Sequence, residues 1–265
     1  GQNVVGVDLV GNADDIVEGD ISQPDTISQQ LQECDVIIHT AALVSNAMQD
    51  SDMWRVNVLA TRNLIQAAKE HKVRRFVQIS SVVAYGNTAE GELDETHPVH
   101  ADGGSYVLTK LASEHVVLSE QANNDIEVVI IRPGDAYGPG SRPWIIAPLE
   151  AIAKNQFMLP EKGEGFFRPI YIDDLVRGIA MASRHPDAAG EIFNLSCEGY
   201  MSTKDYFTPH YQWLGKKGPM LVSTKLALRI SAIASKVADF MGNLNEASPS
   251  TVKQLSTKSW FSIKK

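Results

Sequence analysis

The strongest constraint on the fold is the alternation of strand-like and helix-like segments between residues 4 and 199. Short runs rich in Val and Ile alternate with stretches whose apolar residues recur at helical spacing. This alternation is typical of a parallel sheet, because each parallel connection must cross back from one end of the sheet to the other. The strand-like runs are residues 4–7, 35–39, 75–80, 127–132 and 191–195, and the helix-like stretches are 52–69, 106–121 and one that begins at 171–175.

We therefore predict an α/β fold with a doubly wound parallel sheet. A run of Pro and Gly residues between 133 and 140 interrupts the alternation. After Gly199 the pattern changes to helices with no strand between them. We expect one domain at 1–140 and a small, mainly helical C-terminal lobe at 141–265, with residues 170–198 returning to the first domain.

Composition narrows the classes of partner. The 265 residues are 43% hydrophobic and 21% charged, enough for a packed globular core. The net charge of −8 and the pI of about 5.4 argue against a nucleic acid or an anionic membrane as the main partner. Cys34 and Cys197 have no metal-ligand spacing, so we expect no metal site and a reducing compartment. Without a recognisable signal peptide, we expect a cytoplasmic protein.

Residues 219–241 form the best candidate for membrane contact. Lys225, Arg229, Lys236 and Asp239 interrupt this stretch, and no run reaches the roughly 18 apolar residues that span a bilayer. The apolar residues recur at helical spacing, which predicts an amphipathic helix that covers something apolar. Packing on the core is one interpretation, and a lid that faces the substrate or a membrane is the other.

Tyr106 and Lys110 are four positions apart on a predicted helix, so both project from one face. A neighbouring ammonium favours the phenolate and lowers the phenol pKa from its usual value near 10. The phenol could then act as an acid or base at neutral pH. The pair alone is a weak signal, because Tyr and Lys are common residues.

Ser81 and Asn57 add weight through their spacing. Ser81 follows the strand at 75–80 and precedes Tyr106 by 25 positions, while Asn57 precedes Ser81 by 24. The carboxyl ends of parallel strands line the ligand crevice, so Ser81 faces the place where a cofactor would lie. Its hydroxyl could hold a carbonyl or carbinol oxygen while Tyr106 transfers the proton. Asn57 is expected to hold a helix backbone group or an ordered water.

Together these residues resemble the extended short-chain dehydrogenases/reductases, from residue 4 to about 197. Further stretches similar to the family are 39–42 (His-Thr-Ala-Ala), 132–140 (Arg-Pro-Gly-Asp-Ala-Tyr-Gly-Pro-Gly) and 171–175 (Tyr-Ile-Asp-Asp-Leu). The resemblance implies a Rossmann domain at 1–140, NAD as cofactor and an oxidoreductase activity. It implies catalytic roles for Ser81, Tyr106, Lys110 and Asn57. The residues that it assigns to the cofactor are Asp8, Asp20, Ile21, Thr40, Ala41, Ala42, Tyr106, Lys110 and Pro133.

Several of these assignments have a structural alternative. Asp8 resembles the family's acidic residue for the adenosine ribose, which implies NAD over NADP, but it could instead be a strand-end turn residue. Asp20 could be a cap rather than an adenine contact, and His39 a packed strand-end residue. Ser80 would exchange roles with Ser81 if the alignment shifted by one position.

The family's glycine-rich turn, Gly-x-x-Gly-x-x-Gly, does not occur in the sequence. Its strand is central in the order 3-2-1-4-5-6, so the strands at 4–7 and 75–80 would each have an unpaired edge. We therefore expect roughly 25 to 40 further residues before Gly1, enough for a strand, a turn and a helix. The other interpretation is a degenerate member that binds dinucleotide weakly.

Two branches of the family compete for the reaction. Nucleotide-sugar epimerases and dehydratases typically place an Arg four residues before the position of Tyr171, where this chain has Phe167, with Arg168 displaced by one. The apolar tail resembles the 3β-hydroxysteroid dehydrogenase-like branch. We therefore expect interconversion of a secondary alcohol and a ketone on a bulky apolar, steroid-like or lipid-like substrate. The alternatives are a nucleotide-sugar epimerase/dehydratase and a non-catalytic dinucleotide-binding regulatory protein.

The resemblance also implies a twofold homodimer through the helices at 52–69 and 106–121. Leu64, Val107 and Leu111 are the apolar outer positions that could serve such a contact, although packing against the sheet explains them as well.

Overall fold

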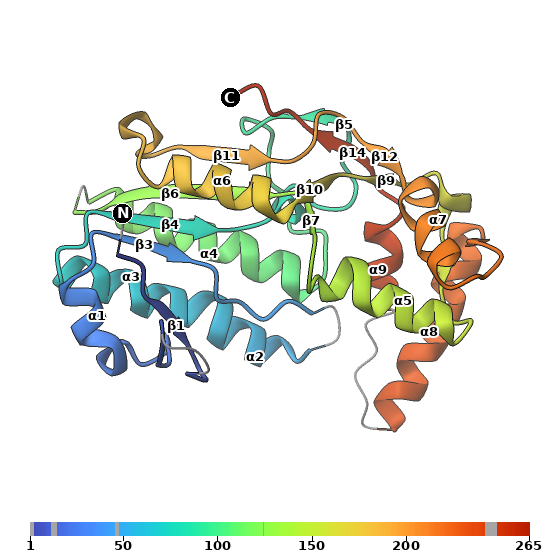
Figure 1. Ribbon diagram of the computed structural model, residues 1–265, viewed down its shortest axis with the longest axis horizontal. Helices are drawn as coiled ribbons and strands as arrows, with labels where there is room; N and C mark the ends of the chain where they lie inside the picture. The colour runs from blue at the N-terminus through green and yellow to red at the C-terminus, as the bar shows by residue number, and fades with distance from the viewer. Residues whose placement is uncertain (1–2, 12–14, 46–47, 124, 242–247) are drawn as a thin grey trace.

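A parallel sheet of four strands runs through the middle of the computed structural model, which describes residues 3–11, 15–45, 48–123, 125–241 and 248–265 (Figure 1). Its spatial order is β11-β6-β4-β3. The strands are β3 (Val36–His39), β4 (Arg75–Ile79), β6 (Glu127–Pro133) and β11 (Ile192–Leu195). Each lies within one residue of a run that the sequence predicted.

Helices cover both faces of this sheet. Helices α3 (Thr61–Glu70) and α4 (Ser105–Gln121) lie on one face, and α6 (Ile172–Ala182) lies on the other (Figure 1). A parallel sheet between two helical layers is a doubly wound α/β fold. The predicted fold class is therefore confirmed.

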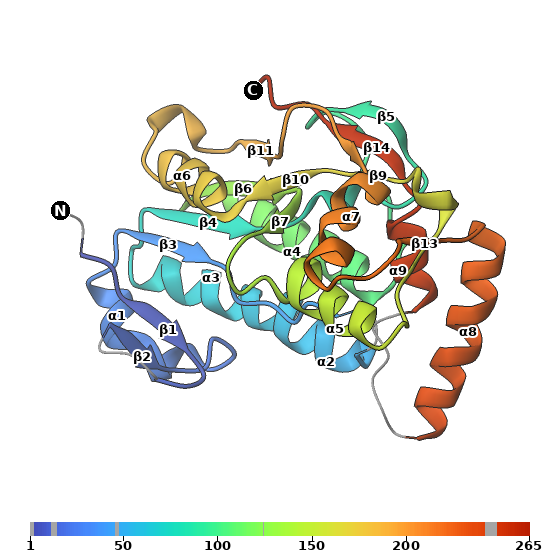
Figure 2. The same cartoon turned by 45° about the vertical axis from the view of Figure 1, so that its right-hand side comes forward.

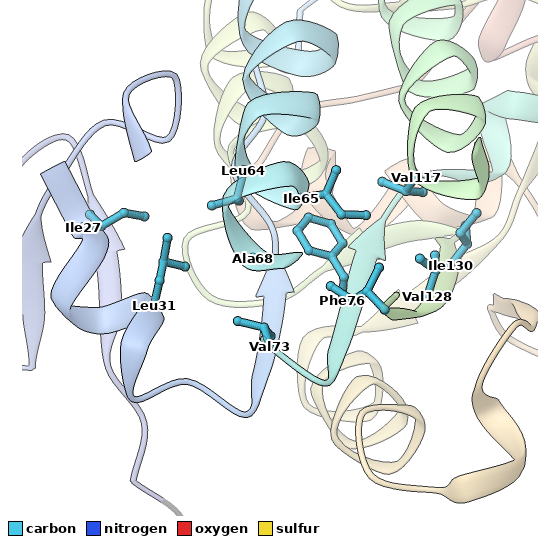
Figure 3. Packing of buried hydrophobic residues seen from close by; sticks show 11 residues of the cluster. Ile27, Leu31, Leu64, Ile65, Ala68, Val73, Phe76, Val117, Val128 and Ile130 are labelled. Carbon is cyan, nitrogen blue, oxygen red and sulfur yellow. The ribbon is translucent and has the colours of Figure 1, made fainter. Parts of the chain in front are cut away.

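The middle residues of the central strands are mostly apolar because they supply two cores. Successive strand side chains point to opposite faces. Phe76, Val128 and Ile130 enter the core under α3 and α4, and Figure 3 shows the Phe76 ring beside Ile65 of α3. The neighbouring residues in sequence enter the core under α6: Val77, Val129 and Ile131.

The helix predicted at 52–69 is a continuous helical rod with one irregularity. It consists of α2 (Asp50–Trp54), a π-helical turn at Arg55–Ala60 and α3. A π-helical turn inserts an extra residue and changes which side chains face inward. Asn57 lies in this turn and is buried.

The first two strands form a separate sheet. Strands β1 (Gly6–Asp8) and β2 (Ile16–Glu18) pair with each other in parallel. They are joined to the main body through α1 (Ser28–Gln32), whose Leu31 packs in the core under α3 (Figures 2 and 3).

One expectation about unpaired edges is wrong. Strand β4 lies between β3 and β6, so both edges of the strand at 75–80 are paired. Among the residues that the structure describes, β1 pairs only with β2 and β3 only with β4. Both β1 and β3 therefore have an unpaired edge, and the sheet of β1 and β2 is not hydrogen-bonded to the sheet that contains β3.

The C-terminal lobe combines helices with short strand pairs. Its helices are α5 (Ala147–Ala153), α7 (Thr203–Trp213), α8 (Thr224–Phe240) and α9 (Pro249–Gln254). The short strands form pairs with one another, and some of them come from parts of the chain before the lobe. They are β5 (Glu90–Leu93), β7 (Asp135–Tyr137), β8 (Met158–Leu159), β9 (Phe166–Phe167), β10 (Pro169–Tyr171), β12 (Met201–Ser202), β13 (Met220–Leu221) and β14 (Lys258–Phe261).

The expectation of a tail without strands is therefore wrong. Strands β12, β13 and β14 pair with β9, β8 and β5, all from earlier parts of the chain. Such short strands carry too few residues for an alternating pattern to show, and their partners are distant in sequence. The boundary at residue 140 stays a prediction, although α6 and β11 do join the central layers.

The apolar positions proposed for a dimer contact are mostly used inside the chain. Leu64 and Val107 are buried, Leu64 in the core with Ile27 and Leu31, and Leu111 is half-buried. The burial of Leu64 and Val107 agrees with packing inside the chain, the other interpretation of these positions, and the homodimer stays a prediction. No described helix has both the length and the apolar character needed to cross a bilayer.

Replacing Phe76 tests the core under α3. Phe76→Ala removes a fully buried ring and leaves a cavity, so the free energy of unfolding should fall by about 3–5 kcal/mol. Urea denaturation monitored by circular dichroism measures this. The control Val176→Ala removes a side chain that is 55% exposed on α6 and should change stability by less than about 0.5 kcal/mol. Equal effects of the two substitutions would contradict the assigned core.

Candidate active site

Ser81 lies just beyond the carboxyl end of β4. Its hydroxyl accepts a hydrogen bond from the Val83 backbone N–H at 3.3 Å and thereby caps a short 3₁₀ turn, Val82–Tyr85. The side chain is half-buried and also forms a hydrogen bond with Tyr106. The turn therefore holds the Ser81 hydroxyl beside the phenol.

Tyr106 and Lys110 project from the first turns of α4. The Lys110 ammonium lies 6.0 Å from the centroid of the Tyr106 ring. Its Nζ donates a hydrogen bond to the Ile79 carbonyl at 2.9 Å, which anchors α4 to the end of β4. The structure thus brings Ser81, Tyr106 and Lys110 together at the carboxyl end of the sheet.

The expected direction of the Tyr106 pKa is wrong. Burial raises the pKa of Tyr106 to about 12, and the Ser81 hydrogen bond only partly opposes this. The Lys110 ammonium, which donates to the Ile79 carbonyl, favours the phenolate too weakly to offset the loss of solvent around the phenol. Burial likewise lowers the pKa of Lys110 to about 8, against the opposing effect of Glu114.

A buried ion pair lies behind these residues, and the sequence analysis did not identify it. Glu114 accepts two hydrogen bonds from Arg132, with Nε to Oε1 at 2.9 Å and Nη2 to Oε2 at 2.7 Å. The Ser80 hydroxyl donates to the same carboxylate at 2.5 Å. Ser80 is thus held in a structural network, which supports Ser81 as the hydroxyl of the site. The available signal was Glu114 four positions after Lys110 on α4.

Asn57 is used entirely for internal hydrogen bonds. Its Oδ1 accepts from the Leu43 backbone N–H at 2.7 Å, and its Nδ2 donates to the Leu43 carbonyl at 3.0 Å and to Thr109 Oγ1 at 3.1 Å. The side chain therefore ties the loop after β3 to α4. It holds backbone groups, as expected, but those of a loop rather than a helix.

His39 is a packed residue. Its Nε2 lies 2.9 Å from Thr61 Oγ1, and the Thr61 hydroxyl already donates to the Asn57 carbonyl at 2.8 Å. The imidazole must therefore be the donor. Burial, assisted by the Lys110 charge, lowers the pKa of His39 to about 3. A ring that stays neutral and bonded in this way has no role as an acid or base.

The residues expected on the adenosine side lie around β1 and β2. Asp8 is exposed at the end of β1. Asp20 Oδ1 accepts from the Ser22 backbone N–H at 2.8 Å, and hydrogen bonds from Ser22 lower the pKa of Asp20. This is a local turn and not a helix cap, because the next helical turn begins at Pro24 with Gln23 as its N-cap. Ile21 packs partly against the core under α3.

The residues expected near the middle of the cofactor lie at two strand ends. Thr40 and Ala41 are exposed and Ala42 is half-buried directly after β3, while Pro133 is buried at the end of β6. A nicotinamide and its ribose therefore fit the chemistry of the groups at this edge. No glycine-rich strand-to-helix turn that could hold a pyrophosphate lies within the described ranges.

Arg168 is held in a second buried ion pair. Its Nε lies 3.2 Å from Asp135 Oδ2, and its backbone N–H donates to the same oxygen at 3.0 Å. Its Nη1 donates to Thr257 Oγ1 at 2.6 Å. Burial raises the pKa of Asp135. The guanidinium therefore joins β7, β10 and the tail, and it is not free for a ligand.

A doubly wound parallel sheet with Ser, Tyr and Lys at its carboxyl edge defines a Rossmann-type dinucleotide-binding protein. The model of the NAD dependent epimerase/dehydratase family matches residues 1–196, and the chain belongs to this family. Membership confirms the resemblance to the extended short-chain dehydrogenases/reductases and NAD as the family's cofactor.

Curated relatives include enzymes with different substrates. Sterol-4-alpha-carboxylate 3-dehydrogenase ERG26, decarboxylating, of Candida albicans is 30% identical over 209 residues, which cover 74% of this chain and 57% of that protein. The dTDP-glucose 4,6-dehydratase of Streptomyces niveus is 30% identical over 185 residues, covering 68% and 54%. The chain thus spans little more than half the length of these relatives.

Among solved structures, MoeE5 in complex with UDP-glucuronic acid and NAD superposes with a TM-score of 0.74 at 26% identity. The match covers 84% of this chain and 77% of that chain.

The His39 environment predicts a pH dependence of stability. The ring protonates near pH 6.5 when unfolded but only near pH 3 when folded. The unfolded chain therefore binds the extra proton, and wild-type stability should fall as the pH drops through this window, by about 2 kcal/mol at pH 5 from His39 alone. His39→Gln keeps a side-chain N–H donor but has no group that titrates. Denaturation measured at pH 7 and at pH 5 should therefore show a loss of stability between the two pH values that is about 2 kcal/mol smaller than in the wild type. The control His115→Gln, on the exposed side of α4, should show the same loss as the wild type.

Proposed function

We propose that this protein is an NAD-dependent oxidoreductase that interconverts a secondary alcohol and a ketone on a bulky apolar, steroid-like or lipid-like substrate. The main support for this reaction is the cluster of Ser81, Tyr106 and Lys110 at the carboxyl edge of the sheet. A hydroxyl donor, a phenol and a buried ammonium are the groups that proton transfer at a carbonyl oxygen needs.

Each side chain has a separate task in the proposed mechanism. When bound, NAD supplies the group that accepts or donates a hydride. The Ser81 hydroxyl holds the substrate oxygen, and Tyr106 exchanges a proton with it. The buried Lys110 ammonium favours negative charge on the phenol oxygen as the proton leaves and donates to the cofactor ribose.

The raised pKa of Tyr106 has a directional consequence. A phenol with a pKa of about 12 keeps its proton at neutral pH. Ketone reduction requires that proton, whereas alcohol oxidation requires the phenol to lose it. The reduction should therefore be ready at neutral pH, and the oxidation rate should rise as the pH increases.

Two features support an apolar substrate. Arg168 is one position after the place in the sequence where the sugar enzymes have an Arg for the diphosphate. Its guanidinium is held by Asp135 and Thr257. The lobe also contains an aromatic cluster that begins at Tyr137 on β7, where the Tyr137 ring lies 5.5 Å from Tyr171 and 6.0 Å from Tyr206. A lobe rich in aromatic side chains suits a steroid-like or lipid-like alcohol.

The named relatives divide between two candidates. The sterol-4-alpha-carboxylate 3-dehydrogenase of Candida albicans supports the apolar substrate. The MoeE5 complex with UDP-glucuronic acid favours the alternative, a nucleotide-sugar epimerase or dehydratase. The fixed Arg168 makes the apolar substrate the stronger proposal.

The phenol can be tested with a panel of secondary alcohols and one nucleotide sugar. Wild-type protein with NAD should reduce the cofactor with a hydroxysteroid, as followed by absorbance, and faster at pH 9 than at pH 7. Tyr106→Phe should lower kcat by about 100-fold or more. The control Tyr200→Phe alters a tyrosine that is 47% exposed in the lobe and should keep the wild-type rate. Turnover of the nucleotide sugar alone would favour the alternative.

Asp8 can be tested by equilibrium binding of NAD and NADP. Its carboxylate should accept hydrogen bonds from the ribose hydroxyls and repel a 2′-phosphate, so wild-type protein should prefer NAD. Asp8→Asn should reduce that preference by about tenfold, equivalent to about 1.4 kcal/mol. Glu18→Gln removes an equal charge from the adjacent exposed position of β2 and should leave the preference intact. Equal affinity of wild-type protein for both cofactors would refute the assignment.

A further inference from the structure

Helix α8 exposes a continuous apolar stripe. The members and their exposed fractions are Leu226 (46%), Ile230 (41%), Ile233 (65%), Val237 (53%) and Met241 (65%). Their spacing of three or four positions places them on one face of the helix. Core packing, one interpretation of residues 219–241, is therefore wrong for this face.

The side of α8 about a quarter of a turn from the stripe, away from the cations of the helix, is docked on the lobe. Ala227 and Ser231 are buried there, with exposed fractions of 0% and 2%. In both views α8 lies at the outer edge of the molecule, and its C-terminal half extends beyond the rest of the lobe (Figures 1 and 2). The stripe therefore stays exposed along one flank of the helix while another side of the helix is attached to the lobe.

Three cations accompany the stripe along α8. Lys225, Arg229 and Lys236 are exposed, and their spacing places them on one side, about a quarter of a turn around the helix from the apolar residues. None of them forms an ion pair with any residue in the described part of the chain. The side chain of Asp239 lies outside the described residues.

The C-terminal part of the chain, which contains α8, is basic although the whole protein is acidic. Residues 199–265 contain ten Lys and Arg but three Asp and Glu, a net charge of +7. Residues 1–198 contain the remaining 14 Lys and Arg and 29 Asp and Glu, a net charge of −15. The net charge of −8 therefore does not describe the part of the chain that contains α8, and it does not exclude an anionic membrane as a partner of this helix.

We propose that α8 docks this protein onto an anionic phospholipid surface. The helix lies in the plane of the interface, with the apolar stripe at the boundary of the acyl chains and the cations at the lipid phosphates. An amphipathic helix that combines a strong apolar face with Lys and Arg on its polar side has the composition of such interfacial helices. Exposed cations add attraction to negatively charged lipids. The proposal is independent of the reaction assigned above.

The first test measures binding of the full chain to vesicles by cosedimentation. Vesicles that contain phosphatidylserine in phosphatidylcholine should bind the protein, and pure phosphatidylcholine vesicles should bind it much more weakly. Raising the NaCl concentration from about 0.1 M to about 0.5 M should weaken binding, because salt screens the cations. Equal binding to both vesicle types, or to neither, would overturn the proposal.

Matched variants test the two components separately. The double variant Arg229→Gln/Lys236→Gln removes two positive charges from α8. It should bind the anionic vesicles about 30-fold more weakly, because each cation near the membrane surface contributes about fivefold to the affinity. The control Arg62→Gln/Lys72→Gln neutralises two exposed cations elsewhere, on and just after α3, and should have little effect.

The apolar component is tested with Ile233→Ser/Val237→Ser, which should weaken vesicle binding by about tenfold or more. The control Val176→Ser/Met181→Ser alters apolar residues of α6 with similar exposure, 55% and 64%, and should bind like wild type. Because these side chains are exposed, all variants should keep the wild-type circular dichroism and melting temperature.

Two results would assign α8 to a different occupant and overturn the proposal. If the Ile233 and Val237 variant bound vesicles normally but lost a wild-type self-association seen by sedimentation, the stripe would be a contact between copies of the chain. If it bound vesicles normally but raised KM for an apolar alcohol, the stripe would be a substrate lid.

Discussion

The buried carboxylate of Glu114 is the contact on which the geometry of the candidate site depends. It joins three elements, because it lies on α4 and accepts hydrogen bonds from Ser80 after β4 and Arg132 on β6. Glu114 and Arg132 are 2% and 3% exposed, so separating them would leave a charge without a partner in the interior. Ser81 follows Ser80, and Tyr106 and Lys110 precede Glu114 on the same helix. The positions of the reacting groups therefore follow from this pair.

The Asp135–Arg168 pair has the corresponding role between the sheet and the lobe. It connects β7 with β10, and through Thr257 it connects both with the tail. The same geometry supports the proposed apolar substrate, because a guanidinium with these partners is not free for a diphosphate.

The distribution of charge separates the two parts of the chain. The acidic part contains the sheet and the candidate site, and the basic part contains α7, α8 and α9. At ordinary salt, charges more than about 10 Å away are largely screened. A partner that approaches α8 is therefore affected mainly by the charges near this helix. Whole-chain charge is therefore a poor guide to the partners of α8.

The sequence by itself determined the central strands and the shared face of Tyr106 and Lys110. Strands buried on both faces must be apolar throughout, and helix geometry brings residues four apart together, so both results depend only on neighbouring residues. Only the tertiary structure decided the direction of the Tyr106 pKa, the partners of Glu114 and Arg168, and the short strands of the tail. Each of these depends on segments distant in sequence: burial by other elements raises the phenol pKa, and β14 is a strand only because β5 lies beside it. The exposed stripe of α8 belongs with them, because helical spacing predicts an apolar face but cannot say what covers it.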